Sequence, residues 1–475
     1  MTSRKGFDTY LLISGFALFA MFFGAGNLIF PFQVGVLSGA NVIPAVIGIL
    51  LTGVLLPVSG MLASSTDSHG VGRIADRIGR VPGLMLTVAI FLFTGMLYAM
   101  PRVGTVSWEM AVKPLLGIPA EDTGASTLGL AIYSVVFFGI AVVLMLRPDR
   151  VIDRIGSYLT PALLVLLLVM VGIAMFKLPS VETLNLDPGY ASAPFTTGLK
   201  TGYGTMDALA SLVFGVVIIT QLHAHGYNEK RSVFRATAFT AGLAGALLAI
   251  VYTGLAFVGT RVADQVFANP AAGLAYAADL IFGPFGKVLF SLIVFLACLT
   301  TAVGLLSAST QYFGDLFPRV DGRIIMAVHI VVTLIVANLG LDNILAVVVT
   351  IGLATYPPAI CLIIVTLVDY AVRPQFFWGY RLPAWVAGII GIFEAISVFS
   401  LPSWESVSPW QQALQDVLHV LPLGSLQMGW TVPAVVAFAI GVVIDLVRPV
   451  SLENLPHSLT PSGIPDRTSK TDLEV

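Results

Sequence analysis

The chain contains twelve hydrophobic segments of about twenty residues each, and this repetition constrains its fold more than any other feature. A helix of about twenty apolar residues crosses the hydrocarbon core of a bilayer. Hydrophobic residues make up 57% of the 475 residues and charged residues only 11%, whereas a water-soluble domain has about 25% charged residues. We therefore predict an all-α polytopic membrane protein. The predicted spans cover residues 10–32, 41–64, 82–108, 128–146, 157–177, 203–223, 233–259, 286–312, 323–340, 343–369, 383–401 and 430–448.

The positive charges alternate between the two sides of these spans. With the N-terminus placed inside, eighteen of the 24 lysines and arginines fall in inner segments, five in outer segments and one, Arg102, within a span. Cytoplasmic loops of membrane proteins carry the excess of lysine and arginine. We therefore predict a multi-pass protein of the plasma or inner membrane, with an even number of spans and both termini in the cytoplasm.

Two spans are interrupted by residues that a straight membrane helix does not need. Residues 21–31 of the first span read Met-Phe-Phe-Gly-Ala-Gly-Asn-Leu-Ile-Phe-Pro, and the sixth span opens with two glycines and Asp207 within residues 202–215. Broken helices persist in lipid only where the freed backbone groups line a protected cavity. Interruptions at corresponding positions in two halves of a chain indicate the binding site of a secondary transporter.

The interrupted spans are five spans apart, so a second five-span unit would be inverted relative to the first. We predict a five-plus-five inverted repeat in which helices 1 and 6 are broken. Residues 402–428 contain an amphipathic stretch, which predicts a short external helix in the membrane interface. The predicted divisions are a cytoplasmic N-terminus (1–9), the first repeat (10–177), the inverted repeat (203–369), two further spans with the external segment (383–448) and a cytoplasmic polar tail (449–475).

The first interruption offers ligands of two kinds. The half-helix that follows a break presents amide N–H groups that suit a carboxylate, and the carbonyl groups that end the preceding half-helix suit a cation. Gly24 and Gly26 let a ligand approach the backbone closely, and Asn27 adds an amide that can complete a cation's oxygen shell or cap the helix. The alternative is that the glycines form a packing face between helices, which does not account for Asn27 and Pro31.

Four stretches, in order along the chain, resemble the branched-chain amino acid:cation symporter family. They are residues 16–31, Met-Pro-Arg-Val at 100–103, residues 204–215, and Leu-Thr-Thr-Ala-Val-Gly-Leu at 299–305. The resemblance implies the amino acid–polyamine–organocation superfamily and its leucine-transporter fold. It also implies inward transport of leucine, isoleucine and valine coupled to sodium.

The resemblance further implies a sodium site at the paired threonines of span 8. Sodium is a hard cation that prefers oxygen ligands. Thr300 and Thr301 would supply hydroxyl oxygens, and the carbonyl groups of Ala20, Phe23 and Ala297 would supply the remainder. The alternative for paired threonines in a span is hydrogen bonding to the preceding helical turn.

Three ionisable residues fall within predicted spans, where charge is expensive and usually functional. Asp207 could complete a cation site, relay a proton in coupling or cap the broken helix, unless span 6 starts later and leaves it in water at the outer mouth. Arg102 could extend to the outer interface, pair with Glu109 or, as the less favoured interpretation, reach the substrate. Glu394 lies outside the repeat, which favours a packing or oligomer-contact role.

The residues around the two breaks predict an apolar pocket for the side chain of an amino acid. One methylene group changes binding by only about 1–3 kcal/mol in such a pocket, so it would discriminate poorly among leucine, isoleucine and valine. The predicted substrate-binding residues are Phe23, Gly24, Ala25, Gly26, Asn27, Ala210, Ser211 and Phe214, with Phe22 beside them.

The residues alone are compatible with three functions. The first is a sodium-coupled importer of branched-chain amino acids; the second is a transporter of the same fold that moves another small solute or uses protons. The third is a channel or nutrient sensor, which is disfavoured because the chain lacks rings of polar pore residues and a sizeable soluble domain. No nucleophile–base pair or phosphate-binding loop indicates an enzyme, and no nucleic-acid partner is expected. The oligomeric state stays open.

Overall fold

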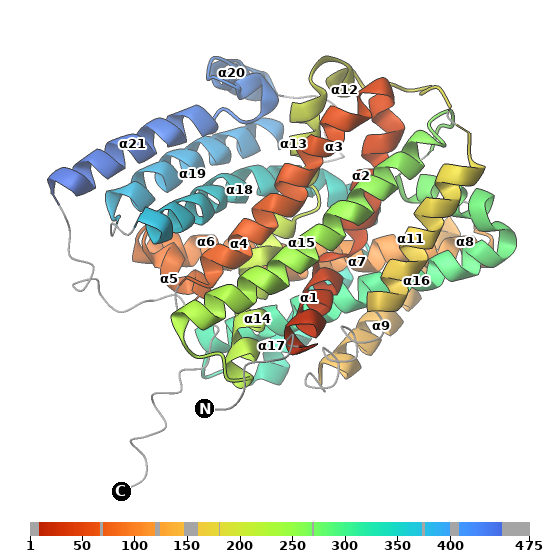
Figure 1. Cartoon of the computed structure of the whole chain (residues 1–475), viewed down its shortest axis with the longest axis horizontal. Helices are drawn as coiled ribbons and strands as arrows, with labels where there is room; N and C mark the ends of the chain where they lie inside the picture. The colour runs from red at the N-terminus through yellow and green to blue at the C-terminus, as the bar shows by residue number, and fades with distance from the viewer. Residues whose placement is uncertain are drawn as a thin grey trace, which may run out of the picture.

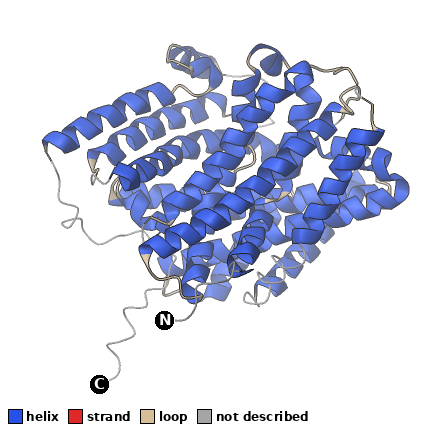
Figure 2. Cartoon of the chain, viewed as in Figure 1, coloured by secondary structure: helices blue, strands red, loops and turns tan. Residues whose placement is uncertain are grey.

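The computed structural model describes residues 9–66, 70–118, 124–146, 160–179, 181–267, 270–372, 376–399 and 408–448, and these residues form helices and connecting loops without a β-strand (Figure 2). The predicted N-terminus (1–8) and polar tail (449–475) lie outside the described residues, as do residues 402–407 of the external segment. The described chain is therefore all-α, as the sequence predicts.

The first half of the described chain is built from short helices joined end to end. Three π-helical turns (η2, η3 and η4) lie within these longer helical stretches. The helices are α1 (Thr9–Phe22), α2 (Ala25–Ser38), η1 (Gly39–Asn41), α3 (Val42–Leu50), η2 (Leu51–Leu55), α4 (Leu56–Ser64), α5 (Gly70–Asp76), α6 (Arg80–Leu92), η3 (Phe93–Leu97), α7 (Ala99–Ser107), η4 (Trp108–Val112), α8 (Lys113–Leu116), α9 (Gly124–Met145) and α11 (Thr160–Lys177).

The second half contains longer helices, including α16, which bends at Gly283 where φ is +64°. The helices are α12 (Pro188–Ser192), α13 (Pro194–Tyr203), α14 (Asp207–Ala224), α15 (Lys230–Thr260), α16 (Pro270–Leu316), α17 (Gly322–Ala337), α18 (Leu341–Val372), α19 (Trp378–Val398), α20 (Pro409–His419), η6 (Gly424–Leu426) and α21 (Thr431–Val447).

Several of these helices are long and apolar enough to cross a membrane. Within the described residues, eight helical stretches meet that condition, and four shorter apolar helices accompany them. The chain is therefore a multi-pass membrane protein. The eight stretches are Ala25–Ser64, Arg80–Leu116, Leu128–Met145, Asp207–Ala224, Lys230–Thr260, Phe290–Leu316, Thr350–Val372 and Trp378–Val398, and the shorter helices are Thr9–Phe22, Leu163–Lys177, Gly322–Ala337 and Thr431–Val447.

Glycines allow two pairs of helices to pack backbone against backbone. A Cβ atom added to Gly35 of α2 would lie 1.8 Å from the carbonyl oxygen of Ala256 in α15. Similarly, a Cβ atom added to Gly198 of α13 would lie 2.1 Å from the carbonyl oxygen of Ala45 in α3. Only glycine permits so close an approach, so these positions set the spacing of α2 from α15 and of α13 from α3.

The C-terminal helices form a group beside the helices described above. Helices α18, α19 and α21 lie side by side, and α20 packs on α19 (Figure 1). Asp445 of α21 accepts hydrogen bonds from the backbone amides of Phe377, Trp378 and Gly379 at 2.9 Å each, which satisfies N–H groups at the start of α19. Helix α20 falls in the external segment for which the amphipathic pattern predicted a short helix.

Candidate transport site

The first helical discontinuity lies at Phe23 and Gly24, between the end of α1 and the start of α2. Gly24 is extended, with φ −118° and ψ −155°, and its amide donates to Asn27 Oδ1 at 3.4 Å. A Cβ atom added to Gly24 would lie 2.8 Å from Thr301 Oγ1, so α16 approaches the backbone closely at this point. The sequence Gly-Ala-Gly-Asn thus lies at the start of α2 and faces neighbouring helices.

The second discontinuity comprises Gly204, Thr205 and Met206, between α13 and α14. Met206 adopts a left-handed conformation with φ +69°, which is unusual for a residue other than glycine. Helix α14 then begins at Asp207, so a carboxylate lies at the positive end of a helix dipole. Such strained backbone conformations are concentrated at functional sites.

A hydrogen-bonded group of three side chains joins the two discontinuities. Asn27 Nδ2 donates to Asp207 Oδ2 at 2.5 Å, and the hydroxyl of Tyr252 in α15 donates to the same oxygen at 2.7 Å. Asp207 is only 3% exposed, so it does not lie in water at an outer mouth. Sequence reasoning missed Tyr252, for which the only signal was a tyrosine hydroxyl within a span that needs a partner.

The predicted sodium ligands converge between α1 and α16. Thr300 Oγ1 donates to the carbonyl oxygens of Ala20 at 3.1 Å and Ala297 at 2.9 Å, and Thr301 Oγ1 donates to that of Ala20 at 3.3 Å. Thr300 therefore makes both the bond to its own helix and a bond to α1. Phe23 lies one residue before Gly24, but its ring stacks on Phe19, with centroids 5.1 Å apart.

Arg102 of α7 lies at the second discontinuity rather than at the outer interface. Its side chain is 3% exposed, and Nη1 donates to the Tyr98 hydroxyl at 2.9 Å and to the Gly204 carbonyl at 2.6 Å. Nη2 donates to the carbonyl of Thr205 at 3.2 Å. The interpretations in which Arg102 extends outward or pairs with Glu109 are wrong, because the buried guanidinium bonds to carbonyl groups in the loop after α13 and Glu109 pairs with Lys113.

Two further ionisable residues, Glu109 and Glu394, interact with nearby groups of the same chain. Glu109 pairs with Lys113, one helical turn later, at 3.0 Å. Glu394 is 3% exposed and accepts a hydrogen bond from the Gly429 amide at 3.0 Å, which links α19 to the loop before α21. This contact is a packing interaction within the chain.

A central cavity of about 20 Å³ lies between the two discontinuities. Five of the predicted substrate-binding residues line it: Gly24, Ala25, Asn27, Ala210 and Phe214. Arg102, Asp207 and Thr301 line it as well. This volume accommodates about one water molecule or a bare cation, but not an amino acid.

Three predicted substrate-binding residues lie outside this lining. Ser211 donates to the Ala208 carbonyl at 2.7 Å, and its hydroxyl lies 2.0 Å from where a Cβ on Gly60 of α4 would be. Ser211 therefore faces α4, because successive helical residues point about 100° apart. Phe23 is fully buried against Phe19, and Gly26 lies against the guanidinium of Arg102.

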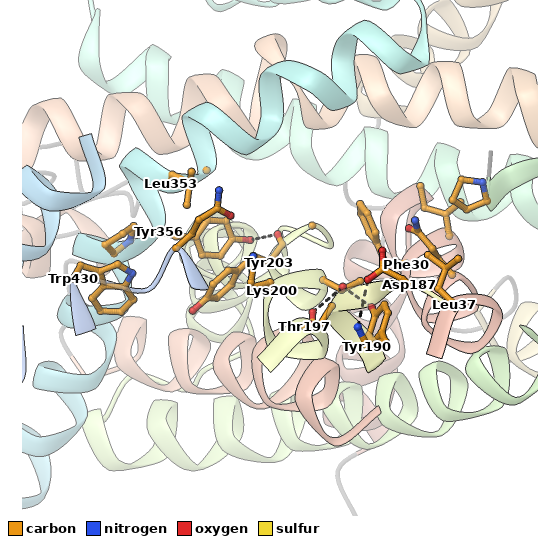
Figure 3. Close-up of a pocket in the computed structure, with 18 residues that line it drawn as sticks. Phe30, Leu37, Asp187, Tyr190, Thr197, Lys200, Tyr203, Leu353, Tyr356 and Trp430 are labelled. Atoms are coloured by element: carbon orange, nitrogen blue, oxygen red, sulfur yellow. Dashed lines mark hydrogen bonds between the residues drawn. The ribbon is translucent and has the colours of Figure 1, made fainter. Parts of the chain in front are cut away.

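A second, larger cavity of about 480 Å³ lies between α2, α13, α18 and the segment before α21 (Figure 3). The Tyr356 hydroxyl donates to the Tyr203 carbonyl at 2.8 Å, and the two rings lie 4.9 Å apart. Phe30 and Gly204 also line this cavity and are in contact with Arg102. At its other end, burial raises the pKa of Tyr190 to about 12, so its hydroxyl stays protonated and bonds with Thr201.

The fold resembles that of solved membrane transporters. The structure of Mhp1, a nucleobase-cation-symport-1 family transporter, in a closed conformation with bromovinylhydantoin bound, superposes with a TM-score of 0.58 and 15% identity, covering 93% of this chain and 94% of that one. An inward-facing conformation of Mhp1 gives a TM-score of 0.53. These likenesses show the fold, and the family model and relatives described next show the class, which is that of a transport protein rather than an enzyme.

The chain belongs to the branched-chain amino acid transport protein family, whose model matches residues 8–448. It is 38% identical to the branched-chain amino acid permease BrnQ of Corynebacterium glutamicum, over 92% of this chain and 95% of that protein. It is 37% identical to the branched-chain amino acid transport system 2 carrier protein of Pseudomonas aeruginosa, over 94% and 98%. The Escherichia coli permease BrnQ is 34% identical over 92% and 95%.

Proposed function

We propose that this protein imports leucine, isoleucine and valine together with sodium, by alternating access. The observation that carries the proposal is the convergence of Ala20, Thr300 and Thr301 beside the break at Gly24. The full-length similarity to permeases named for branched-chain amino acids supports the substrate.

The convergence supports a cation site for a chemical reason. Two hydroxyl oxygens and the carbonyl oxygens of Ala20 and Ala297 meet between α1 and α16. Hard cations take such neutral oxygen donors, and a bound sodium ion would turn the hydroxyl hydrogens away from the carbonyls. In this proposal sodium is a co-transported substrate. The carbonyl group of Phe23 is the remaining predicted ligand.

The helix contacts support an inverted repeat of five plus five spans. Helix α2, the outer half of proposed span 1, packs through Gly35 on α15, which is span 7. Helix α14, the inner half of proposed span 6, packs on α4, which belongs to span 2, with Gly60 of α4 facing Ser211. An inverted repeat relates the outer half of span 1 to the inner half of span 6 and span 7 to span 2, so the same contact occurs in both proposed repeats.

The two cavities support alternating access. In the proposed topology of twelve spans with cytoplasmic termini, the 480 Å³ cavity borders α12 and α13 and lies on the outer side. The 20 Å³ cavity lies deeper, at the two breaks. A substrate would enter the outer cavity and reach the central one only after the intervening side chains move, as gating around a fixed site requires.

The apolar part of the central lining suits an aliphatic side chain. Phe22 and Phe214 meet edge to face with ring centroids 5.4 Å apart, and Ala210 adds a small apolar surface beside them. Such a site favours apolar substrates but separates leucine from valine by only about 1–3 kcal/mol.

Leucine uptake into proteoliposomes tests the proposal. We expect labelled leucine to accumulate when sodium is higher outside, and unlabelled isoleucine or valine to compete. Counterflow with leucine inside would separate carrier activity from leakage. Uptake of no branched-chain amino acid under any gradient would contradict the proposal.

Coupling to protons is the second candidate, and one observation favours it. Asp207 is buried among Asn27 and Tyr252 at the centre of the site, where ionisable residues of transporters often relay protons. A pH gradient that drives leucine uptake without sodium would transfer the coupling role from Thr300 and Thr301 to Asp207.

A further inference from the structure

Arg102 retains unused hydrogen-bonding capacity at the central cavity. A guanidinium group has five N–H donors. Two on Nη1 bond to Tyr98 and Gly204, and one on Nη2 bonds to Thr205. The Nε atom is buried without a hydrogen-bond partner among the described residues. Nε–H and the second Nη2 hydrogen therefore stay available.

We propose that Arg102 binds the α-carboxylate of the transported amino acid. This inference rests on the proposed function and extends it by assigning the residue that recognises a free carboxylate. Nε and Nη2 lie along one edge of the planar guanidinium. That edge offers two parallel N–H groups, and arginine binds a carboxylate through two hydrogen bonds in this geometry.

The position of Arg102 matches the backbone element that also suits an anion. A Cβ atom added to Gly26 would lie 2.6 Å from Arg102 Nη2, so the guanidinium lies against the first turn of α2. That turn carries free amide N–H groups and positive partial charge. A carboxylate at the Nε–Nη2 edge, beside this turn, would meet donors from both.

The charges that line the cavity complement a zwitterion. Arg102 and Asp207 both line it, and each bonds to neutral groups in the structure: Arg102 to a phenol and carbonyls, Asp207 to an amide and a phenol. An amino acid brings one negative and one positive charge. Its carboxylate would satisfy Arg102, and its ammonium group would lie nearer Asp207 and the carbonyls at the end of α13.

Binding would exchange the partners of Arg102. The cavity of about 20 Å³ must expand for an amino acid, and Arg102, bonded to Gly204, stands between it and the outer cavity, which Phe30 and Gly204 line. A carboxylate on the Nε–Nη2 edge carries a full negative charge, whereas the carbonyl groups of Gly204 and Thr205 are neutral acceptors. Its attraction would draw the guanidinium away from these carbonyl groups and free the end of α13 to move.

Comparison of leucine with leucinamide tests this assignment, because the amide keeps the ammonium group and side chain but lacks the carboxylate. Equilibrium binding of both is measured on the purified full-length wild-type protein, R102Q, R102K and the control R381Q, which alters an arginine at the inner end of α19. We expect the wild-type to prefer leucine strongly. In R102Q the ratio of leucine affinity to leucinamide affinity should fall about 10- to 150-fold, while the affinity for leucinamide stays unchanged.

The control and the conservative variant make the test specific. R381Q should keep the wild-type preference, and R102K should fall between, because an ammonium group has charge but no planar edge. If R102Q does not reach the membrane, R102K is used instead, and a preference of R102K for leucine over leucinamide equal to that of the wild-type protein overturns the assignment. Equal binding of leucine and leucinamide by the wild-type protein also overturns it, whereas a wild-type protein that binds no branched-chain amino acid overturns the proposed function itself.

Discussion

Asn27 and Asp207, 180 positions apart, meet through a hydrogen bond of 2.5 Å between Nδ2 and Oδ2. Asn27 lies in the first turn of α2 and Asp207 is the first residue of α14, so the bond ties the starts of two helices that each follow a discontinuity. Tyr252 holds the same carboxylate from α15. A ligand at either discontinuity would thus act on both.

Removal of one hydroxyl from the proposed sodium site should weaken sodium binding. Thr301→Val keeps the shape of the side chain but removes an oxygen. The loss of about 1–3 kcal/mol should raise the sodium concentration for half-maximal leucine uptake about 5- to 150-fold. Because sodium and leucine binding are linked, leucine affinity should recover at saturating sodium. The measurement is leucine uptake titrated with sodium at fixed membrane potential, with potassium as replacement.

Thr310→Val is the matched control for this prediction. Thr310 lies on the same helix, and its hydroxyl has no hydrogen-bond partner among the described residues. Its sodium titration should match that of the wild-type protein. If Thr301→Val and Thr310→Val gave the same curve, Thr301 would not be a sodium ligand.

Loss of the Tyr252 hydroxyl should destabilise the protein more than loss of another buried tyrosine hydroxyl. Tyr252 donates to a carboxylate at 2.7 Å, whereas Tyr312 donates to the hydroxyl of Thr87 at 2.9 Å. A hydrogen bond to a charged group contributes about 1.5–3 kcal/mol and a neutral one about 0.5–1.5 kcal/mol. Tyr252→Phe should therefore lower the melting temperature of the purified protein more than Tyr312→Phe. The reverse order would count against an ionised Asp207.

Gly26→Ala should impair transport, although alanine is compatible with the helical backbone at this position. The added Cβ would lie 2.6 Å from Arg102 Nη2 and displace a guanidinium that three hydrogen bonds hold. Gly139→Ala in α9 is the control, since a Cβ there would meet no atom of the described residues within 4 Å. We expect Gly26→Ala to raise the KM for leucine at normal membrane abundance. An unaltered KM, also with Gly26→Leu, would make Gly24 and Gly26 a packing motif.

Labelling of single cysteines should reveal the predicted topology. The native Cys298 and Cys361 are buried, so they give little background. Leu116, 63% exposed at the end of α8, is predicted outside, and exposed Glu229 before α15 is predicted inside. A membrane-impermeant maleimide should label Leu116→Cys in intact cells, but Glu229→Cys only after permeabilisation. Labelling of Glu229→Cys in intact cells would contradict the inverted repeat.

Local features of the sequence determined the class of the protein, and they predicted interruptions near Gly24 and Gly204. Apolar segments of about twenty residues require helices in a bilayer, because backbone groups there must bond within the helix. Gly24 and Gly204 lie in the two loops where the structure ends one helix and begins the next. The resemblance of four stretches identified the family, and the comparisons confirm it.

Only the tertiary structure decided which side chains meet. Tyr252 reaches Asp207 because α15 packs on α14 as well as on α2, and Ser211 faces α4 although it lies one residue from Ala210 in the central lining. Arg102 is buried against the carbonyl group of Gly204, in the loop after α13, rather than extended outward. The rotation of each helix about its axis depends on contacts between distant segments, and hydrophobicity alone does not specify it in an almost uniformly apolar chain.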